Sequence, residues 1–108
     1  EVFKRATNIA TQAPDGEPSP PAGGAHASEA ALFAAYRRFA SRADSLSTAG
    51  DYTTLLREVA TIAPIMHRYF IDVFVMDPDA TIRENRLRLM RAISDRCAKV
   101  AKLELLAT

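Results

Sequence analysis

The residues best suited to binding chemistry are an asparagine and several arginines, most of them in the last quarter of the chain. The asparagine amide offers a hydrogen-bond donor and an acceptor together, and the arginine guanidinium offers a planar fork of donors. Such groups recognise the edges of nucleic-acid bases and the oxygens of phosphates. The candidates for these contacts are Arg83, Asn85, Arg88 and Arg91, with Arg68 from a neighbouring helix.

The sequence lacks the combinations of residues that catalysis or metal binding requires. Cys97 is the single cysteine, which excludes an internal disulfide and any site with two cysteine ligands. His26 and His67 lie 41 positions apart without a second ligand beside either, which argues against a zinc site. The chain has neither a glycine-rich phosphate loop nor a nucleophile with a nearby base. We therefore predict no catalytic residue, no metal and no cofactor in this chain.

The distribution of charge favours a local contact with an anionic partner. Residues 79–102 contain seven basic and three acidic residues, a net charge of +4, although the whole chain has a formal net charge of +1. A basic helix on a nearly neutral domain is typical of a surface that meets an anion at one place. The alternative is a solvated helix face, with pairs four residues apart such as Glu84 and Arg88.

Arg86 does not fit that alternative. At about 100° per residue, Arg86 falls between Leu89 and Ile93, inside the apolar stripe of its helix. A buried guanidinium needs a partner, because an unpaired buried charge costs several kcal/mol. Asp72, which precedes the turn into this helix, is the nearest candidate in the sequence. We predict a structural ion pair between Asp72 and Arg86.

Three segments organise the chain. Residues 1–13 predict a short leading helix, because apolar residues recur there at helical spacing. Residues 14–27 hold four of the six prolines and three of the four glycines, so we predict a mobile loop. Residues 28–108 predict the main helical bundle. No apolar run approaches the roughly 20 residues of a membrane helix, so no membrane contact is expected. The missing initial methionine indicates a fragment of a longer protein.

Cap and turn residues divide the bundle into helices. Ser28 is predicted as an N-cap, Gly50 as a helix stop and Asp51 as the next N-cap. Pro64 lies inside a continuing apolar pattern, which indicates either a kinked helix or the end of one helix and the start of another. We prefer the second interpretation.

The last helix is expected to begin after an apolar turn. Residues 73–76 are interpreted as a helix end that turns inward, and residues 77–79 as an N-cap, a first-turn proline and a further acid. From there one helix is predicted to run to about Leu106. No segment combines period-two alternation with flanking turns, so the predicted fold is all-α, a small bundle of four to five helices.

Several motifs in this order resemble the C-terminal domain of the bacterial-type glycyl-tRNA synthetase β subunit. The family shows an A-P pair, an F-F-D element, V-x-V-M and R-x-N-R-L-x-L-L. The corresponding residues here are Ala63-Pro64, Tyr69-Phe70-Ile71-Asp72, Val73-Phe74-Val75-Met76 and Arg83-Glu84-Asn85-Arg86-Leu87-Arg88-Leu89-Met90. Upstream, Lys4-Arg5 with Asn8-Ile9 resembles the family's K-R-x-x-N-I helix, and Gly50-Asp51-Tyr52 resembles its G-D-Y turn. The resemblance spans residues 1–106 and is interrupted at 14–27.

The resemblance implies a DALR-type anticodon-binding domain. Such a domain binds the anticodon loop of tRNA-Gly, while glycine is attached with ATP at a distant site on the α subunit or on the α part of a fused chain. The implied setting is the bacterial cytoplasm, or a plastid or other organelle. Tyr69 and Phe74 replace the family's usual Phe and Met and are expected to keep the core apolar. Lys102 and Glu104 also depart from the family pattern.

Two hypotheses about function follow. In the first, Arg83 and Asn85 face the bases of an unpaired RNA loop, and Arg68, Arg88 and Arg91 neutralise phosphates. In the second, the chain is a helical protein–protein interaction module with no direct RNA contact. Salt-dependent binding to an anticodon stem-loop distinguishes the two, because only the first hypothesis predicts it.

Overall fold

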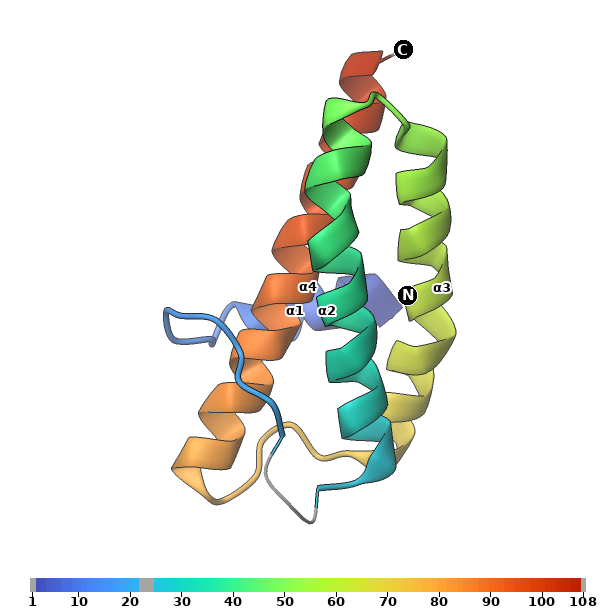
Figure 1. The fold of residues 1–108 in the computed structure, drawn as a ribbon. Coiled ribbons are helices and arrows are strands. Elements are labelled where there is room, and N and C mark those ends of the chain that lie inside the picture. Colours follow the sequence, from blue (N-terminus) through green and yellow to red (C-terminus); the bar gives the residue numbers. More distant parts are fainter. Residues whose placement is uncertain (1, 22–24, 108) are drawn as a thin grey trace.

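The computed structural model describes the backbone of residues 2–21 and 25–107 and the side chains as far as residue 101. This part of the chain contains four α-helices and no strand, which confirms the all-α prediction. The helices are α1 (Val2–Ala10), α2 (Ala27–Thr48), α3 (Tyr52–Asp72) and α4 (Ala80–Ala107) (Figure 1). The departures at Lys102 and Glu104 lie outside the described side chains.

Helices α2 and α3 form an antiparallel hairpin, and the residues at its turn behave as predicted. Gly50 has φ of +73°, a left-handed conformation that glycine adopts without steric cost. The Gly50 and Asp51 amides donate to the carbonyls of Ser47 and Leu46, which closes the end of α2. The Asp51 carboxylate accepts from the Thr54 amide at 3.1 Å and caps α3. Local sequence alone therefore determines this turn.

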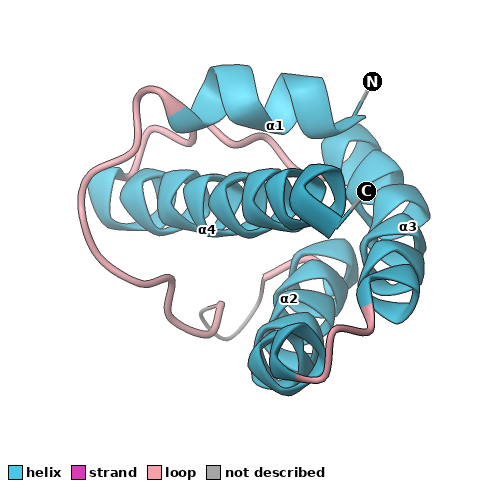
Figure 2. Ribbon diagram, turned by 90° about the horizontal axis from the view of Figure 1, so that it is seen from above, coloured by secondary structure: helices cyan, strands magenta, loops and turns pink. Residues whose placement is uncertain are grey.

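Helix α4 lies between α1 on one side and the α2–α3 hairpin on the other (Figure 2). Each helix contributes buried apolar residues, and in α2, α3 and α4 these fall along one side of the helix. The largest fully buried side chains are Leu32, Phe39, Leu55, Ile62, Met66, Tyr69, Met90 and Ile93. Packing of these side chains fixes the orientation of α4 and so decides which of its faces meets solvent.

The prediction that a helix ends at Pro64 was wrong. Helix α3 continues through Pro64 without interruption. A proline inside a helix removes one backbone hydrogen bond and crowds the preceding turn. Here the ring lies on the exposed side of α3, while Ile62 and Met66 are buried on the side facing the core. Because Ile62 before the proline and Met66 after it both pack into the core, the segments on either side of Pro64 remain one continuous helix.

The starts of two helices differ by two residues from the prediction. His26, and not Ser28, caps α2, with its Nδ1 accepting from the Ser28 amide at 3.0 Å. Asp79, and not Asp77, caps α4, with Oδ1 accepting from the amides of the second and third helical residues. Asp77 instead accepts from the Asp79 amide at 2.8 Å and shapes the preceding turn.

The segment between α3 and α4 alternates between the core and solvent. Val73 and Val75 are buried, as expected of a chain end that turns inward. Phe74 is 69% exposed and Met76 is 41% exposed, so the expectation that Phe74 belongs to the core was wrong. The backbone at Val73 is extended, and successive side chains of an extended chain point to opposite sides.

The proline-rich segment after α1 lies along the outer side of α4 (Figure 1). Residues 14–21, which we call the strap, carry Pro18 as a buried residue although their neighbours are mostly exposed. Mobility of residues 14–27 stays a prediction. Among the described residues, no helix is long and apolar enough to cross a membrane.

Candidate nucleic-acid interface

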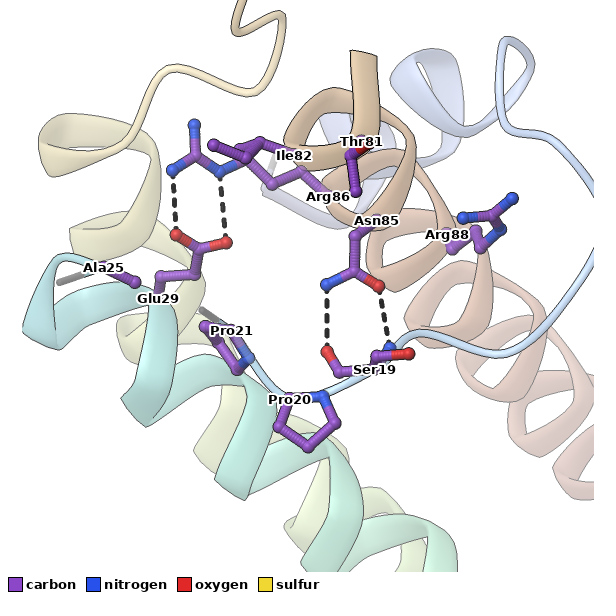
Figure 3. A pocket seen from close by; sticks show the side chains of 10 residues that line it. All are labelled: Ser19, Pro20, Pro21, Ala25, Glu29, Thr81, Ile82, Asn85, Arg86 and Arg88. Atoms are coloured by element: carbon purple, nitrogen blue, oxygen red, sulfur yellow. Dashed lines mark hydrogen bonds and ion pairs between the residues drawn. The ribbon is translucent and has the colours of Figure 1, made fainter. Parts of the chain in front are cut away.

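Arg86 lies inside the bundle, but its carboxylate partner is Glu29 and not Asp72. The Arg86 Nε and Nη2 atoms donate to the two Glu29 carboxylate oxygens at 3.1 and 2.9 Å (Figure 3). Its Nη1 donates to the Phe74 carbonyl at 2.7 Å and lies 3.5 Å from an Asp77 oxygen. The two side chains are 12% and 6% exposed. The predicted Asp72–Arg86 ion pair was therefore wrong, although the need for a buried partner was correct.

Asp72 is held by the start of α2 and by its own helix. Its Oδ2 accepts from the Ser28 hydroxyl and from Arg68 Nε, the latter at 2.9 Å. The Ser28 hydroxyl, and after it Arg68, holds the pKa of the Asp72 carboxyl below its ordinary value. Asp72, the last residue of α3, therefore contacts the start of α2, and α4 receives its buried carboxylate from Glu29 of α2 instead.

Arg83 lies at the start of α4 and is tied to the turn before it. Its Nη1 donates to the carbonyl of Asp77 at 3.0 Å and to that of Pro78 at 3.3 Å. The side chain is half-buried. Arg83 and Arg86 together therefore fix the backbone of the segment between α3 and α4, since each donates to at least one of its carbonyls.

Asn85 forms two reciprocal hydrogen bonds with the strap. Its Oδ1 accepts from the Ser19 amide at 2.7 Å, and its Nδ2 donates to the Ser19 carbonyl at 2.9 Å (Figure 3). The Asn85 side chain thus presents its donor and acceptor outward from a rigid helix. That arrangement is suited to a flat ligand edge with one acceptor and one donor.

Arg88 and Arg91 extend this polar row along α4. Arg88 Nε donates to the Asp15 carbonyl at 2.9 Å, and Arg91 Nη1 lies 3.0 Å from the Asp15 carboxylate. Arg91 is also 3.7 Å from Asp95, one turn further along the helix. We call Asn85, Arg88 and Arg91 the α4 row. All three sequence-predicted members of this row share one face, whereas Arg68 lies on α3.

A cavity of about 380 Å³ lies between the strap and the first turns of α4. The residues that line it are Ser19, Pro20, Pro21, Ala25, Glu29, Thr81, Ile82, Asn85, Arg86 and Arg88 (Figure 3). Its wall carries both a buried ion pair and the amide of Asn85. Within the described ranges, no group of three or more potential metal ligands is close enough to hold an ion.

Sequence reasoning missed Glu29 and the strap. Glu29 is 4% exposed, yet in the sequence it appears only as an acid in the first turn of a helix. Its spacing from Phe33 and Tyr36, which are buried on the same helix, offered a signal that the carboxylate faces inward. Nothing comparable marks Asp15 and Ser19, because their contacts depend on the path of a loop.

A family model described as the DALR anticodon binding domain matches residues 1–103. Curated relatives include the glycine–tRNA ligase β subunit of Anaeromyxobacter dehalogenans, 39% identical over 94 residues, which cover 85% of this chain and 13% of the relative. That of Moorella thermoacetica is 33% identical over 100 residues, covering 93% and 14%. That of Neisseria meningitidis is 33% identical over 78 residues, covering 72% and 11%. The chain therefore spans about an eighth of the length of these relatives. No solved structure matches it.

Proposed function

Because this chain belongs to the DALR anticodon-binding domain family, we propose that it binds the anticodon loop of tRNA-Gly as part of a glycine–tRNA ligase β subunit. In this proposal the chain contributes no catalytic residue. Glycine is attached with ATP at a distant site, on an α subunit or on the α part of a fused chain. The setting is the bacterial cytoplasm, or a plastid or other organelle.

The observation that carries the proposal is the α4 row. Anticodon bases are unpaired, so their Watson–Crick edges are open to side chains. Glycine anticodons end in two cytosines, and a cytosine edge presents an amino donor beside ring and carbonyl acceptors. The Asn85 amide, with its donor and acceptor facing outward, matches such an edge. Arg88 and Arg91 follow at one-turn intervals and supply charge for the phosphates of the same loop.

Arg83 and Arg68 have different places in this proposal. Arg83 lies two residues before Asn85, near the start of α4. Its Nη1 donates to backbone carbonyls, and in this proposal the remaining donors of its guanidinium contact the bases. Arg68, on α3, pairs with Asp72 and has a side chain that is 69% exposed, so it is available to a phosphate at the edge of the interface.

The test is salt-dependent binding of the full-length protein to the anticodon stem-loop and to variants with each cytosine replaced. We expect Arg83→Ala and Asn85→Ala to reduce discrimination between these RNAs. Arg91→Ala should weaken binding to all of them equally and lower the slope of log K against log salt by about one. Arg57→Ala, which removes an exposed charge near the α2–α3 turn, is the matched control and should change neither quantity.

A specific observation favours a second candidate function, contact with a protein partner. Ile71, Phe74 and Met76 are 62%, 69% and 41% exposed and lie close together in sequence at the α3–α4 junction. Exposed apolar residues that gather in one place are typical of protein–protein contacts. If Phe74→Ser weakens association with the α subunit while no substitution in the α4 row affects RNA binding, the interaction-module hypothesis replaces the first.

A further inference from the structure

The strap occupies the row of side chains that the proposed function assigns to RNA. Ser19 pairs with Asn85, and Asp15 contacts both Arg88 and Arg91. A segment of five residues, Asp15 to Ser19, therefore reaches the whole α4 row. An RNA loop and the strap cannot occupy the same donors and acceptors at the same time.

The strap presents the chemical groups that a nucleotide chain would present. The Ser19 peptide offers one N–H donor and one carbonyl acceptor to a single side-chain amide, as the edge of a cytosine does with its amino group and ring nitrogen. The Asp15 carboxylate lies 3.0 Å from Arg91, where a phosphate oxygen would form the same charge-assisted bond. The order along α4 is then a base-like group at Asn85 and an anion at Arg91.

The middle of the strap is anchored separately. Pro18 is buried, and the Tyr36 hydroxyl donates to Glu17 at 3.0 Å. Gly16 has φ of +113°, a backbone conformation that residues with a side chain rarely adopt, so the path of the strap past Arg88 favours glycine here. Prolines at 14, 18, 20 and 21 limit the conformations available to the released segment, which lowers the entropy lost when it docks.

The contacts between the strap and α4 are nevertheless of a kind that breaks easily. The Asp15 side chain is fully exposed, and both Asp15 and Ser19 lie at the surface. Exposed ion pairs and hydrogen bonds each contribute little net stability, because water replaces them at small cost. A polyanionic loop carries several phosphates, whereas the strap places only the Asp15 carboxylate at the α4 row, so RNA can displace it.

We propose that the strap is an intramolecular mimic of the RNA loop, which occupies the α4 row in the free protein and must leave before RNA binds. This inference rests on the proposed function and concerns how that site is regulated. It requires the strap to compete with RNA and not to assist it. Binding-competent protein is then only a fraction of the total, and the apparent dissociation constant is raised by the inverse of that fraction.

The experiment compares strap variants of the full-length protein for binding to the anticodon stem-loop. Ser19→Pro removes the amide that donates to Asn85, and Asp15→Ala removes the carboxylate at Arg91. We expect the double variant to bind RNA about five- to tenfold more tightly, as for a strap docked in roughly 80–90% of molecules. Ser19→Ala keeps both backbone groups and should bind as the wild type does. Asp44→Ala removes an exposed acid on α2 and controls for net charge.

Hydrogen exchange of the strap provides an independent measurement. When RNA binds, exchange at the Ser19 amide, which donates to Asn85 while the strap is docked, should become faster, because the strap is released. Slower or unchanged exchange in an RNA-bound protein would overturn the proposal, as would a double variant that binds RNA no more tightly than Asp44→Ala. Failure of the proposed function has a different signature: the wild-type protein would not prefer the cytosine-containing stem-loop over its variants at any salt concentration.

Discussion

Arg86 and Arg88 lie two residues apart on α4, and their guanidinium groups have partners of different kinds. Arg86 faces the bundle, where it binds both oxygens of a buried carboxylate and a backbone carbonyl. Arg88 faces outward and donates to one carbonyl of the strap. Two residues along a helix correspond to a rotation of about 200°, so neighbouring arginines reach opposite environments. The same residue type therefore stabilises the fold on the inner face and remains exchangeable on the outer face.

The largest test of this comparison removes the inner carboxylate. Glu29→Ala leaves Arg86 without its bidentate partner in a largely buried position. We expect the free energy of unfolding to fall by about 3–5 kcal/mol, measured by urea denaturation. Glu58→Ala removes the partner of Arg42 from an exposed ion pair and should cost less than about 1 kcal/mol. Equal losses for the two variants would contradict the distinction between inner and outer pairs.

Tyr69 offers a second test of the inner face, in which the substitution is expected to raise the free energy of unfolding and not to lower it. Its side chain is fully buried, and among the described residues its hydroxyl has no hydrogen-bond partner. Burial raises the pKa of this hydroxyl, so it stays neutral at physiological pH. Tyr69→Phe removes an unsatisfied polar atom, and we expect stability to rise by about 1 kcal/mol in thermal or urea unfolding. A loss of stability would indicate that the hydroxyl has a partner in solution.

The contact between the start of α2 and the end of α3 should respond to pH. The pKa of Asp72 is lowered in the folded state, chiefly by the Ser28 hydroxyl, so its stabilising contribution is complete above the unfolded pKa. That contribution is lost as the pH falls through the folded pKa. Ser28→Ala should therefore lower stability at neutral pH, and the difference from the wild type should shrink toward pH 3. A constant difference across this range would show that the hydroxyl acts by packing alone.

The smallest expected effect is on the outer face. Arg88→Ala should change the free energy of unfolding by no more than about 0.5 kcal/mol, because the one hydrogen bond of Arg88 among the described residues is to an exposed loop carbonyl. Urea denaturation of this variant beside Glu29→Ala completes the comparison. A loss of several kcal/mol at Arg88 would show that the strap is an integral part of the folded core.

Local signals in the sequence predicted those features that depend on a few adjacent residues. Gly50 and Asp51 specify the α2–α3 turn by their own backbone and side-chain chemistry, and the structure confirms both. Pro64 shows where such signals fail, since tertiary burial of Ile62 and Met66 outweighs the local cost of a proline. Phe74 shows the converse: its apolar character suggests a core position, but alternation along an extended turn places it outside.

In the candidate site too, some features could be predicted from the sequence and others could not. Helical periodicity placed Arg86 inside the bundle, because the period of an α-helix is fixed. The partners of Arg86 and Asn85 come from segments far away in the chain, 57 positions for Glu29 and 66 for Ser19. The sequence pattern of one helix does not specify which residue from a distant segment will contact its side chains.

The amino-acid sequence by itself determined that the chain is helical, where the turn between α2 and α3 lies, and which residues carry donors and charge. Those properties arise from backbone conformation and side-chain periodicity, which act over a few residues. Only the tertiary structure decided that Glu29 pairs with Arg86, that Asp72 accepts a hydrogen bond from Ser28 at the start of α2, and that the strap covers the α4 row. These pairings depend on how helices and a loop pack in three dimensions, because burial and proximity are properties of the whole fold.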